Sequence, residues 1–304
     1  MKLSLQTPAK INVGLRILGR RDDGFHDLET LFLAVGLFDT LTFERQKVGG
    51  LTLKVEGADV GPARNNLVTR AGRLFQECTG IRCSGRMSLK KRIPAGGGLG
   101  GGSSDAGAAL RLLNRAYGHP MQEKHLAELG GSLGADVAFF TTASAFSMGT
   151  GRGEILLPLD PPPAISVILA LPPVHVATGP AYGSLAAWRN GKEWTPRPLF
   201  EGTPLSDWSA LLPLLVNDFE AVVPADFPPV GAAIAALRNA GAGHTLLSGS
   251  GGAVFGLVPP ESDEGAHATL DRARAIAKAA QAIEPGTDFR VAVTLTSIPG
   301  IEES

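Results

Sequence analysis

Apolar positions alternate with polar ones, or form short continuous runs, in several segments of the first 160 residues. These segments predict strands, because successive side chains of a strand point to opposite faces of a sheet. The expected strands are 11–18, 40–44, 51–55 and 86–93. Elsewhere the apolar residues recur every three or four positions, which predicts amphipathic helices. The expected helices are 66–76, about 104–114 and 123–133.

A short proline-rich segment interrupts this pattern near the middle of the chain. Asp160 and the prolines 161–163 cannot continue a helix or a central strand, so they suit a domain junction. Beyond them the pattern predicts strands over 165–171, 245–247, 253–258 and 289–295, and helices over 229–239 and 264–282. The polar stretch 188–204 is expected to be an irregular surface excursion. Strands and helices mixed without strict alternation predict an α+β fold in two domains, 1–159 and 160–304.

Bulk composition argues against several classes of protein. The chain has 28 Lys and Arg residues against 29 Asp and Glu residues, so its formal charge is −1. No global charge attracts nucleic acid or an anionic membrane, and neither is expected as a partner. The longest apolar candidate, 164–171, is too short to span a membrane, and we expect a cytoplasmic protein. Cys78 and Cys83 are expected to be reduced thiols outside any disulfide or zinc site.

The strongest chemical signal is a glycine-rich segment between the expected strand 86–93 and the next helix. Six of the seven residues in 96–102 are glycine, so backbone N–H groups can approach a ligand without intervening side chains. The positive end of the helix dipole points to the same place, which favours an anion such as phosphate. Ser103 and Ser104 are candidates to cap the helix and to contact phosphate or a metal ion. We expect this loop to pack against little of the core.

Three other interpretations of the loop are weaker. A flexible linker would not lie directly between a strand and a strongly apolar helix. A Walker A loop requires Gly-Lys followed by Ser or Thr, which does not occur here. Gly96, Gly98 and Gly101 have the spacing of a dinucleotide-binding fingerprint. However, the preceding strand carries three basic residues at 90–92, whereas the first strand of a dinucleotide-binding fold is a buried apolar run.

Three segments, in order along the chain, resemble the motifs of the GHMP kinase family. They are Pro-Ala-Lys-Ile-Asn at 8–12, the glycine loop at 94–106 and Leu-Leu-Ser-Gly-Ser-Gly-Gly-Ala at 246–253. The resemblance implies a two-domain GHMP kinase fold with an N-terminal ATP-binding domain and a C-terminal substrate-side α/β domain. The active site would lie in the cleft between the two domains.

Finer similarities indicate one branch of this family, whose acceptor is a cytidine diphosphate sugar-alcohol. The segments that resemble this branch are 24–30, 100–104, 133–137 and 217–220. Two positions depart from its pattern: Ala138 stands in place of a proline, and Gly252-Ala253 in place of Pro-Thr or Pro-Ser. Both lie beside the motif residues.

The resemblance also implies roles for individual residues. Asp136 would be the base that takes the proton from the substrate hydroxyl, and Lys10 the cation that keeps this carboxylate ionised. ATP would be bound by Pro94, Ala95, Gly96, Gly97, Gly98, Leu99, Gly100, Gly101, Gly102, Ser103 and Ser104. The substrate would be contacted by Asn12, Phe25, His26, Thr178, Tyr182, Ser248 and Gly249. ATP would enter with Mg²⁺, without a tightly bound prosthetic group, and the sequence does not specify the metal ligands.

Several alternatives stay open at the level of sequence. Within the family, homoserine-type or mevalonate-type specificity is disfavoured by Gly-Phe-His at 24–26. Outside it, the glycine spacing allows a dinucleotide-dependent oxidoreductase. A non-catalytic nucleotide-binding relative would be expected to lack Lys10 or Asp136, and both are present. We expect a monomer or a weak homodimer.

Overall fold

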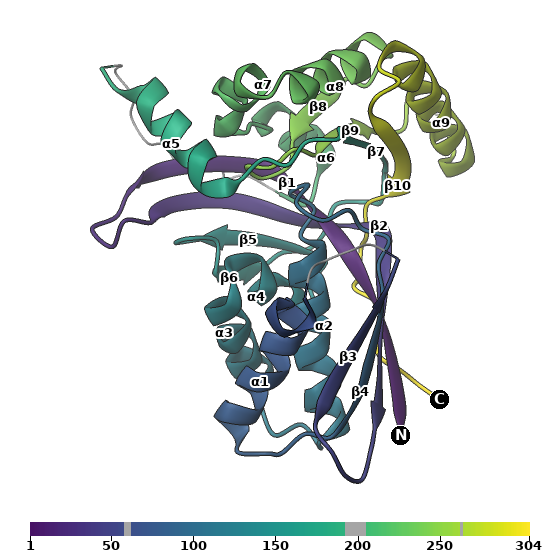
Figure 1. The fold of residues 1–304 in the computed structure, drawn as a ribbon. Helices are drawn as coiled ribbons and strands as arrows, with labels where there is room; N and C mark the ends of the chain where they lie inside the picture. Colours follow the sequence, from purple (N-terminus) through teal and green to yellow (C-terminus); the bar gives the residue numbers. More distant parts are fainter. Residues whose placement is uncertain (58–61, 192–204, 262–263) are drawn as a thin grey trace.

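The computed structural model describes residues 1–57, 62–191, 205–261 and 264–304, and its strands form two sheets (Figure 1). In the larger sheet β11, β1, β2, β4 and β3 are neighbours in that order, while β5 pairs with β2 and β6 with β5. Its described strands are β1 (Lys2–Arg20), β2 (His26–Arg45), β3 (Leu51–Glu56), β4 (Gly85–Lys90), β5 (Phe146–Thr150), β6 (Ile155–Pro158) and β11 (Glu302–Glu303). The smaller sheet is antiparallel, in the order β10, β7, β9, β8. Its described strands are β7 (Ser166–Leu171), β8 (His244–Leu247), β9 (Val254–Val258) and β10 (Asp288–Val293).

Helices cover both sheets. The described α-helices are α1 (Leu67–Thr79), α2 (Gly101–Ala116), α3 (Glu123–Leu133), α4 (Ala135–Thr141), α5 (Thr178–Arg189), α6 (Trp208–Leu211), α7 (Val223–Asp226), α8 (Pro228–Asn239) and α9 (Ala266–Ile283). Short 3₁₀ helices are η1 (Ala63–Asn65), η2 (Leu212–Leu214) and η3 (Asp218–Ala221). In Figure 1, α1 to α4 lie on one side of β1 and β2, and α7 to α9 lie on the other side with the smaller sheet. Within the described ranges, no helix is both long enough and apolar enough to cross a membrane.

β1 and β2 form one long antiparallel hairpin that starts near both chain termini and ends at the opposite edge of the molecule (Figure 1). Three register shifts interrupt the pairing, and one of them follows Asn12. Such bulges change the direction in which nearby side chains point. The turn at the tip is closed by the Arg21 N–H, which donates to the Phe25 carbonyl at 2.8 Å. The hairpin therefore carries Lys10 and Asn12 along its length and Phe25 and His26 at its tip.

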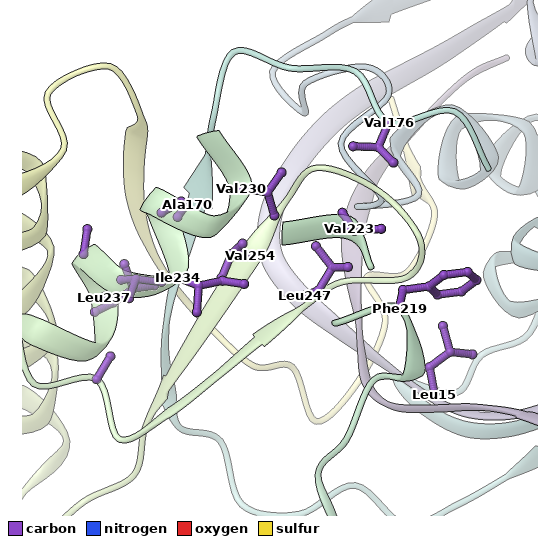
Figure 2. Close-up of a cluster of buried hydrophobic side chains, with 14 of the residues drawn as sticks. Leu15, Ala170, Val176, Phe219, Val223, Val230, Ile234, Leu237, Leu247 and Val254 are labelled. Atoms are coloured by element: carbon purple, nitrogen blue, oxygen red, sulfur yellow. The ribbon is translucent and has the colours of Figure 1, made fainter. Parts of the chain in front are cut away.

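Of the four buried apolar clusters among the described residues, three larger ones hold the sheets and helices together. One packs the larger sheet against α1 and α2, and it includes Phe43 of β2. A second lies between the sheets, where Ile11 and Val13 of β1 meet residues of β7 and β9. The third covers the other face of the smaller sheet, and there Leu15 of β1 lies beside Phe219 (Figure 2). Because burying one such side chain contributes about 1.5–3 kcal/mol, these clusters fix the hairpin against both halves of the chain.

Most expected elements are present, and the α+β fold class is confirmed. Several boundaries were wrong: β1 and β2 are much longer than the expected strands 11–18 and 40–44, the basic strand ends at Lys90, and the helix after the glycine loop begins at Gly101. The sequence pattern did not predict α5 or the short elements α4, α6, α7, β5, β6 and β11. Two glycines and a proline make α5 a poor helix former, and α4, β5 and β6 are short, so none gave a clear period.

Two further expectations have a different outcome. Residues 192–204 of the expected surface excursion lie outside the described residues, and 188–189 form the end of α5. The domain boundary at 159/160 stays a prediction. The last strand, β11, returns to pair with β1, so the end of the chain is part of the larger sheet.

A buried ion cluster holds both ends of the glycine loop. The Lys91 ammonium lies between the carboxylates of Asp39 on β2 and Asp105 on α2, and it donates to Asp105 at 2.8 Å. Asp39 also accepts the backbone N–H of Ile93 at 2.8 Å, and Thr7 donates to Asp105 at 2.9 Å. The three charged side chains are at most 3% exposed. Since the loop starts after Ile93 and ends at the first turn of α2, the cluster fixes its two anchor points.

The cluster contains two carboxylates and one ammonium group in a buried position. Burial raises the pKa of the Asp105 carboxyl to about 6, although the Lys91 charge works against this rise. Burial alone would lower the pKa of Lys91, but attraction to Asp105 and Asp39 outweighs it, and the pKa is raised. We therefore expect Asp105 to titrate at a higher pH than an ordinary aspartate.

We expect Asp105→Asn to change how stability depends on pH. Because burial favours protonated Asp105, its contribution to the free energy of unfolding is present below the ordinary pKa of 3.8 and is lost as pH rises through about 6. The amide cannot titrate, so the unfolding free energy of the unmodified protein should fall relative to that of the variant between roughly pH 4 and 7. Urea unfolding curves at a series of pH values measure this difference. A difference that stays constant over this range would contradict the prediction.

Candidate active site

β1 brings a lysine and an amide to one point, where they meet an aspartate. Lys10 and Asn12 are two residues apart on β1, so their side chains leave the same face of the strand. The Lys10 ammonium donates to Asn12 Oδ1 at 2.6 Å and pairs with Asp136 Oδ2 at 3.2 Å. Asn12 Nδ2 in turn donates to Thr30 Oγ1 on β2 at 2.8 Å. The Lys10 side chain is 4% exposed and that of Asp136 is 34% exposed, so the carboxylate is the accessible member of the pair.

Asp136 owes its position to the short helix α4. It lies in the first turn, where the helix dipole favours a negative charge. Val137, Phe139 and Phe140 on the same helix are buried, and they anchor α4 against its neighbours. The structure thus brings together the two residues for which the sequence predicted a joint role.

Alternate glycines give the loop its course. Gly96, Gly98 and Gly100 have φ angles of 76°, 78° and 69°, which residues other than glycine rarely adopt. A Cβ on Gly98 would lie 2.4 Å from the carbonyl oxygen of Ser248. The loop is therefore packed tightly against another segment of the chain. The expectation that it packs against little of the core was wrong.

Only part of the loop is open to a ligand. Gly101 is buried, and a Cβ there would lie 2.8 Å from the side chain of Ile93. Gly102 is exposed, and the nearest atom to a Cβ there would be a methyl of Leu67 at 3.7 Å. Ser104 is 1% exposed, so its predicted contact with phosphate is not supported by its position. Gly102 therefore marks the open side of the first turn of α2.

The second glycine segment, 248–253, docks against the first. The Ser248 hydroxyl is fully buried and donates to the carbonyl of Gly98 at 3.0 Å. Asn217 donates to the carbonyl of Gly249 at 2.7 Å and so ties the segment to η3. Ser248 lines neither of the cavities described below, and its predicted contact with substrate is not supported. Gly249, in contrast, lies on the inner cavity with Asn12 and Lys10.

Two adjoining cavities run from the Lys10–Asp136 pair to the tip of the hairpin. The inner cavity has a volume of about 240 Å³, and its lining includes Lys10, Asn12, Asp136, Gly98 and Gly249. The outer cavity has a volume of about 770 Å³, and its lining includes Phe25, His26 and the end of α3. Among the residues that the structure describes, five line both cavities: Leu28, Ala135, Arg152, Thr178 and Tyr182. The two cavities are therefore parts of one continuous site.

The outer cavity has an aromatic wall. His26 stacks on Tyr182 with ring centroids 4.6 Å apart, and Tyr182 meets Phe219 edge-on at 4.9 Å. Phe25 is 53% exposed, and the Arg152 guanidinium lies over its ring, 4.7 Å from the centroid. Burial lowers the pKa of His26, with a smaller effect from nearby arginines. Burial also raises the pKa of Tyr182 to about 12, so both rings are neutral at physiological pH.

The sequence did not reveal the role of Asp218, a buried carboxylate that fixes the helix of this aromatic wall to β1. Asp218 accepts the backbone N–H of Ile17 at 2.8 Å and pairs with Arg189 at 2.6 Å and with Arg16 at 3.0 Å. It thereby links β1 to the end of α5, the helix that carries Tyr182. The only signal in the sequence was the position of Asp218 within the motif-like segment 217–220.

Comparisons with known proteins agree with this geometry. The family model described as GHMP kinases N terminal domain matches residues 66–144, and the one described as GHMP kinases C terminal matches residues 199–282. A protein of Pelotomaculum thermopropionicum named 4-diphosphocytidyl-2-C-methyl-D-erythritol kinase is 36% identical over 299 residues, which cover 98% of this chain and 99% of the relative. The chain belongs to the GHMP kinase family.

Other relatives of this GHMP kinase point the same way. A Solibacter usitatus protein with the same printed name is 40% identical over 258 residues, 83% of this chain and 80% of the relative. A crystal structure of 4-(cytidine 5′-diphospho)-2C-methyl-D-erythritol kinase has a TM-score of 0.76 at 32% identity, covering 96% of this chain and 98% of that one. A homoserine kinase from Cytophaga hutchinsonii shares the fold, with a TM-score of 0.63 at 20% identity and coverage of 99% and 96%.

These comparisons decide between the GHMP kinase family and the oxidoreductase that the sequence had left as an alternative. The predicted GHMP kinase family and its two-domain fold are confirmed. The oxidoreductase hypothesis was wrong, because the chain belongs to a kinase family. The strand before the glycine loop, β4, pairs parallel with β3 but antiparallel with β2, so it does not lie in the parallel sheet of a dinucleotide-binding fold. One departure from the family pattern also has a local reason. A Cβ on Gly252 would lie 2.9 Å from the carbonyl oxygen of Val174, so this backbone has no room for the usual proline without a shift.

Substitutions at the two neighbouring glycines at the start of α2 should separate an effect on ATP binding from an effect on stability. We expect Gly102→Val to weaken ATP binding by about tenfold or more, because its side chain would occupy the open side of the phosphate loop. Its stability should stay within about 0.5 kcal/mol of the unmodified protein. Gly101→Val, the matched control, should instead lower stability by about 1–3 kcal/mol through its clash with Ile93. ATP titration and urea unfolding measure the two effects, and unchanged ATP affinity in Gly102→Val would place the phosphates elsewhere.

Proposed function

We propose that this GHMP kinase transfers the γ-phosphoryl group of ATP to the 2-hydroxyl of 4-diphosphocytidyl-2-C-methyl-D-erythritol, in the methylerythritol phosphate route to isoprenoid precursors. The observation that carries the proposal is the continuous site between the Lys10–Asp136 pair and the aromatic hairpin tip. Relatives that bear this kinase's name match the chain over nearly its whole length, which supports the same acceptor. The acceptor has an alcohol at one end and a cytosine at the other, and the site offers a different surface for each.

Phosphoryl transfer requires a hydroxyl that loses its proton as it attacks. In our proposal Asp136 takes that proton while the alcohol oxygen attacks the γ-phosphorus, and the bond to the bridging oxygen of ADP breaks. Lys10 is the charge partner of this carboxylate, with its ammonium 3.2 Å from Asp136 Oδ2. The amide of Asn12 already bonds Lys10 and Thr30, so we assign it to holding the ammonium in place beside the reacting alcohol.

The nucleotide enters from the side of the glycine loop. We assign the ATP phosphates to the backbone N–H groups of 96–102 and to the first turn of α2, where the helix dipole favours negative charge. Gly98 lines the inner cavity, so this loop lies next to the Asp136 carboxylate. Mg²⁺ arrives with ATP as part of the substrate complex.

The cytosine belongs in the outer cavity. Phe25 is 53% exposed and lines this cavity, so we assign it to stacking on the base, a contact worth about 1–3 kcal/mol per base. His26 stacks on Tyr182, which leaves the edge of its neutral imidazole to hydrogen-bond the base. Homoserine and mevalonate have no aromatic base, and nothing in them would use this wall. The outer cavity therefore favours the cytidyl acceptor over the acceptors of these other family members.

The reaction itself is the first test. With MgATP, we expect release of ADP in the presence of 4-diphosphocytidyl-2-C-methyl-D-erythritol and phosphorylation of its 2-hydroxyl, seen by ³¹P NMR. Mevalonate and homoserine are the competing acceptors, and a reaction without acceptor measures background ATP hydrolysis. Turnover of either competing acceptor without turnover of the cytidyl compound would overturn the proposed specificity.

The roles of Lys10 and Asp136 have a kinetic signature. Asp136→Asn keeps the shape of the side chain but removes the base, so kcat should fall by about 10²–10⁴ while ATP still binds. Lys10→Met should show a similar loss, and the double variant should be little worse than either single one, because the two residues act as a unit. Asp27→Asn is the matched control, since this hairpin aspartate pairs with Arg21 and lines neither cavity. A nearly unchanged kcat in Asp136→Asn would exclude it as the base.

A further inference from the structure

Arg152 lies where the inner and outer cavities join. Of the five residues that line both, it alone carries a charge, the others being Leu28, Ala135, Thr178 and Tyr182. Lys10, within the inner cavity, is already paired with Asp136. Arg20 carries charge on the outer cavity but does not line the inner one. Arg152 therefore supplies a positive charge at the middle of the site, between the reacting end and the aromatic wall.

The turn between β5 and β6 directs this arginine inward. Gly151 and Gly153, on either side of it, have φ angles of 68° and 99°, which allow the tight turn. The Gly151 carbonyl accepts the backbone N–H of Leu28 at 2.7 Å and so fixes the turn to β2. Glu154 accepts the backbone N–H of Arg152 at 2.7 Å and also contacts its guanidinium at 3.4 Å. The position of the backbone is thus set before any ligand binds.

We propose that Arg152 binds the diphosphate of the acceptor. This inference rests on the proposed function, which puts the alcohol beside Asp136 and the cytosine beside Phe25. The diphosphate connects these two ends of the acceptor, and it must pass the junction of the cavities. A guanidinium group offers paired N–H donors that match phosphate oxygens, and such charge-assisted hydrogen bonds are stronger than neutral ones.

The present contacts of Arg152 are ones that a diphosphate can replace. Its side chain is 40% exposed, and its ion pair with Glu154 is long at 3.4 Å, so this pair is weak. Its guanidinium lies over the Phe25 ring, 4.7 Å from the centroid, and lines both cavities. A diphosphate carries more negative charge than the Glu154 carboxylate, so it would be a stronger partner for the guanidinium.

The test compares a ligand that has the diphosphate with one that lacks it. CDP and cytidine are titrated calorimetrically against the full-length protein, against Arg152→Gln and against Arg21→Gln. Arg21 is the matched control, since it is also 40% exposed and ion-paired in a turn, but it lines neither cavity. We expect Arg152→Gln to weaken CDP binding by about 10- to 100-fold and cytidine binding by less than about threefold. Arg152→Lys keeps the charge but not the paired donors, and should recover part of the loss.

Each outcome of this experiment decides the inference. Equal losses for CDP and cytidine would overturn it, since Arg152 would then only support the stacking face of Phe25. Unchanged CDP binding in Arg152→Gln, or an equal effect of Arg21→Gln, would overturn it as well. Thermal unfolding of each variant separates these results from a folding defect, and Arg152→Lys provides the folded comparison. If the unmodified protein bound CDP through Arg152 but did not phosphorylate the cytidyl acceptor, the proposed function would fail while this binding site would stand.

Discussion

The shape of the glycine loop depends on one buried ammonium group. Lys91 connects Asp39 on β2 with Asp105 on α2, while Asp39 also bonds the backbone just before the loop. Without that charge, two buried carboxylates would be left uncompensated, which typically costs about 3–5 kcal/mol. The glycines between these anchors can then adopt φ angles that only they tolerate. A loop that is almost entirely glycine has a defined course because both of its ends are fixed by charge.

The same region shows how two lysines near one helix start serve different purposes. A Cβ on Gly100 would lie 3.0 Å from the Lys10 side chain, and a Cβ on Gly101 would lie 3.2 Å from Lys91 Nζ. Lys91 is enclosed by two buried carboxylates, so its charge is compensated within the protein and does not face a ligand. Lys10 faces Asp136, a carboxylate that a ligand can reach. In the proposed reaction, the backbone dipoles of α2 bind the phosphates and the Lys10–Asp136 pair acts on the alcohol.

The sequence alone predicted the family, the fold class and the meeting of Lys10 with Asp136, because short motifs in a fixed order encode them. It could not show which way a serine points, and Ser248 bonds Gly98 instead of facing the substrate. It also could not show that Lys91, one of three consecutive basic residues, pairs with Asp39, 52 positions away. Arg152 was missed because an arginine between two glycines is typical of an exposed turn. A local sequence pattern does not show which distant segments contact each other, and these contacts could not be predicted.

The site joins a rigid half to an adaptable one. Lys10, Asn12 and Thr30 are buried in paired strands and bonded to one another, so the positions of these side chains beside Asp136 are fixed. Phe25 and Arg152 lie on turns and are partly exposed, so their replacement costs little stability. A fold built this way can keep one phosphoryl-transfer centre while the turns around it select different acceptors. In the proposed function, the acceptor is therefore selected at the hairpin tip and the β5–β6 turn rather than in the core.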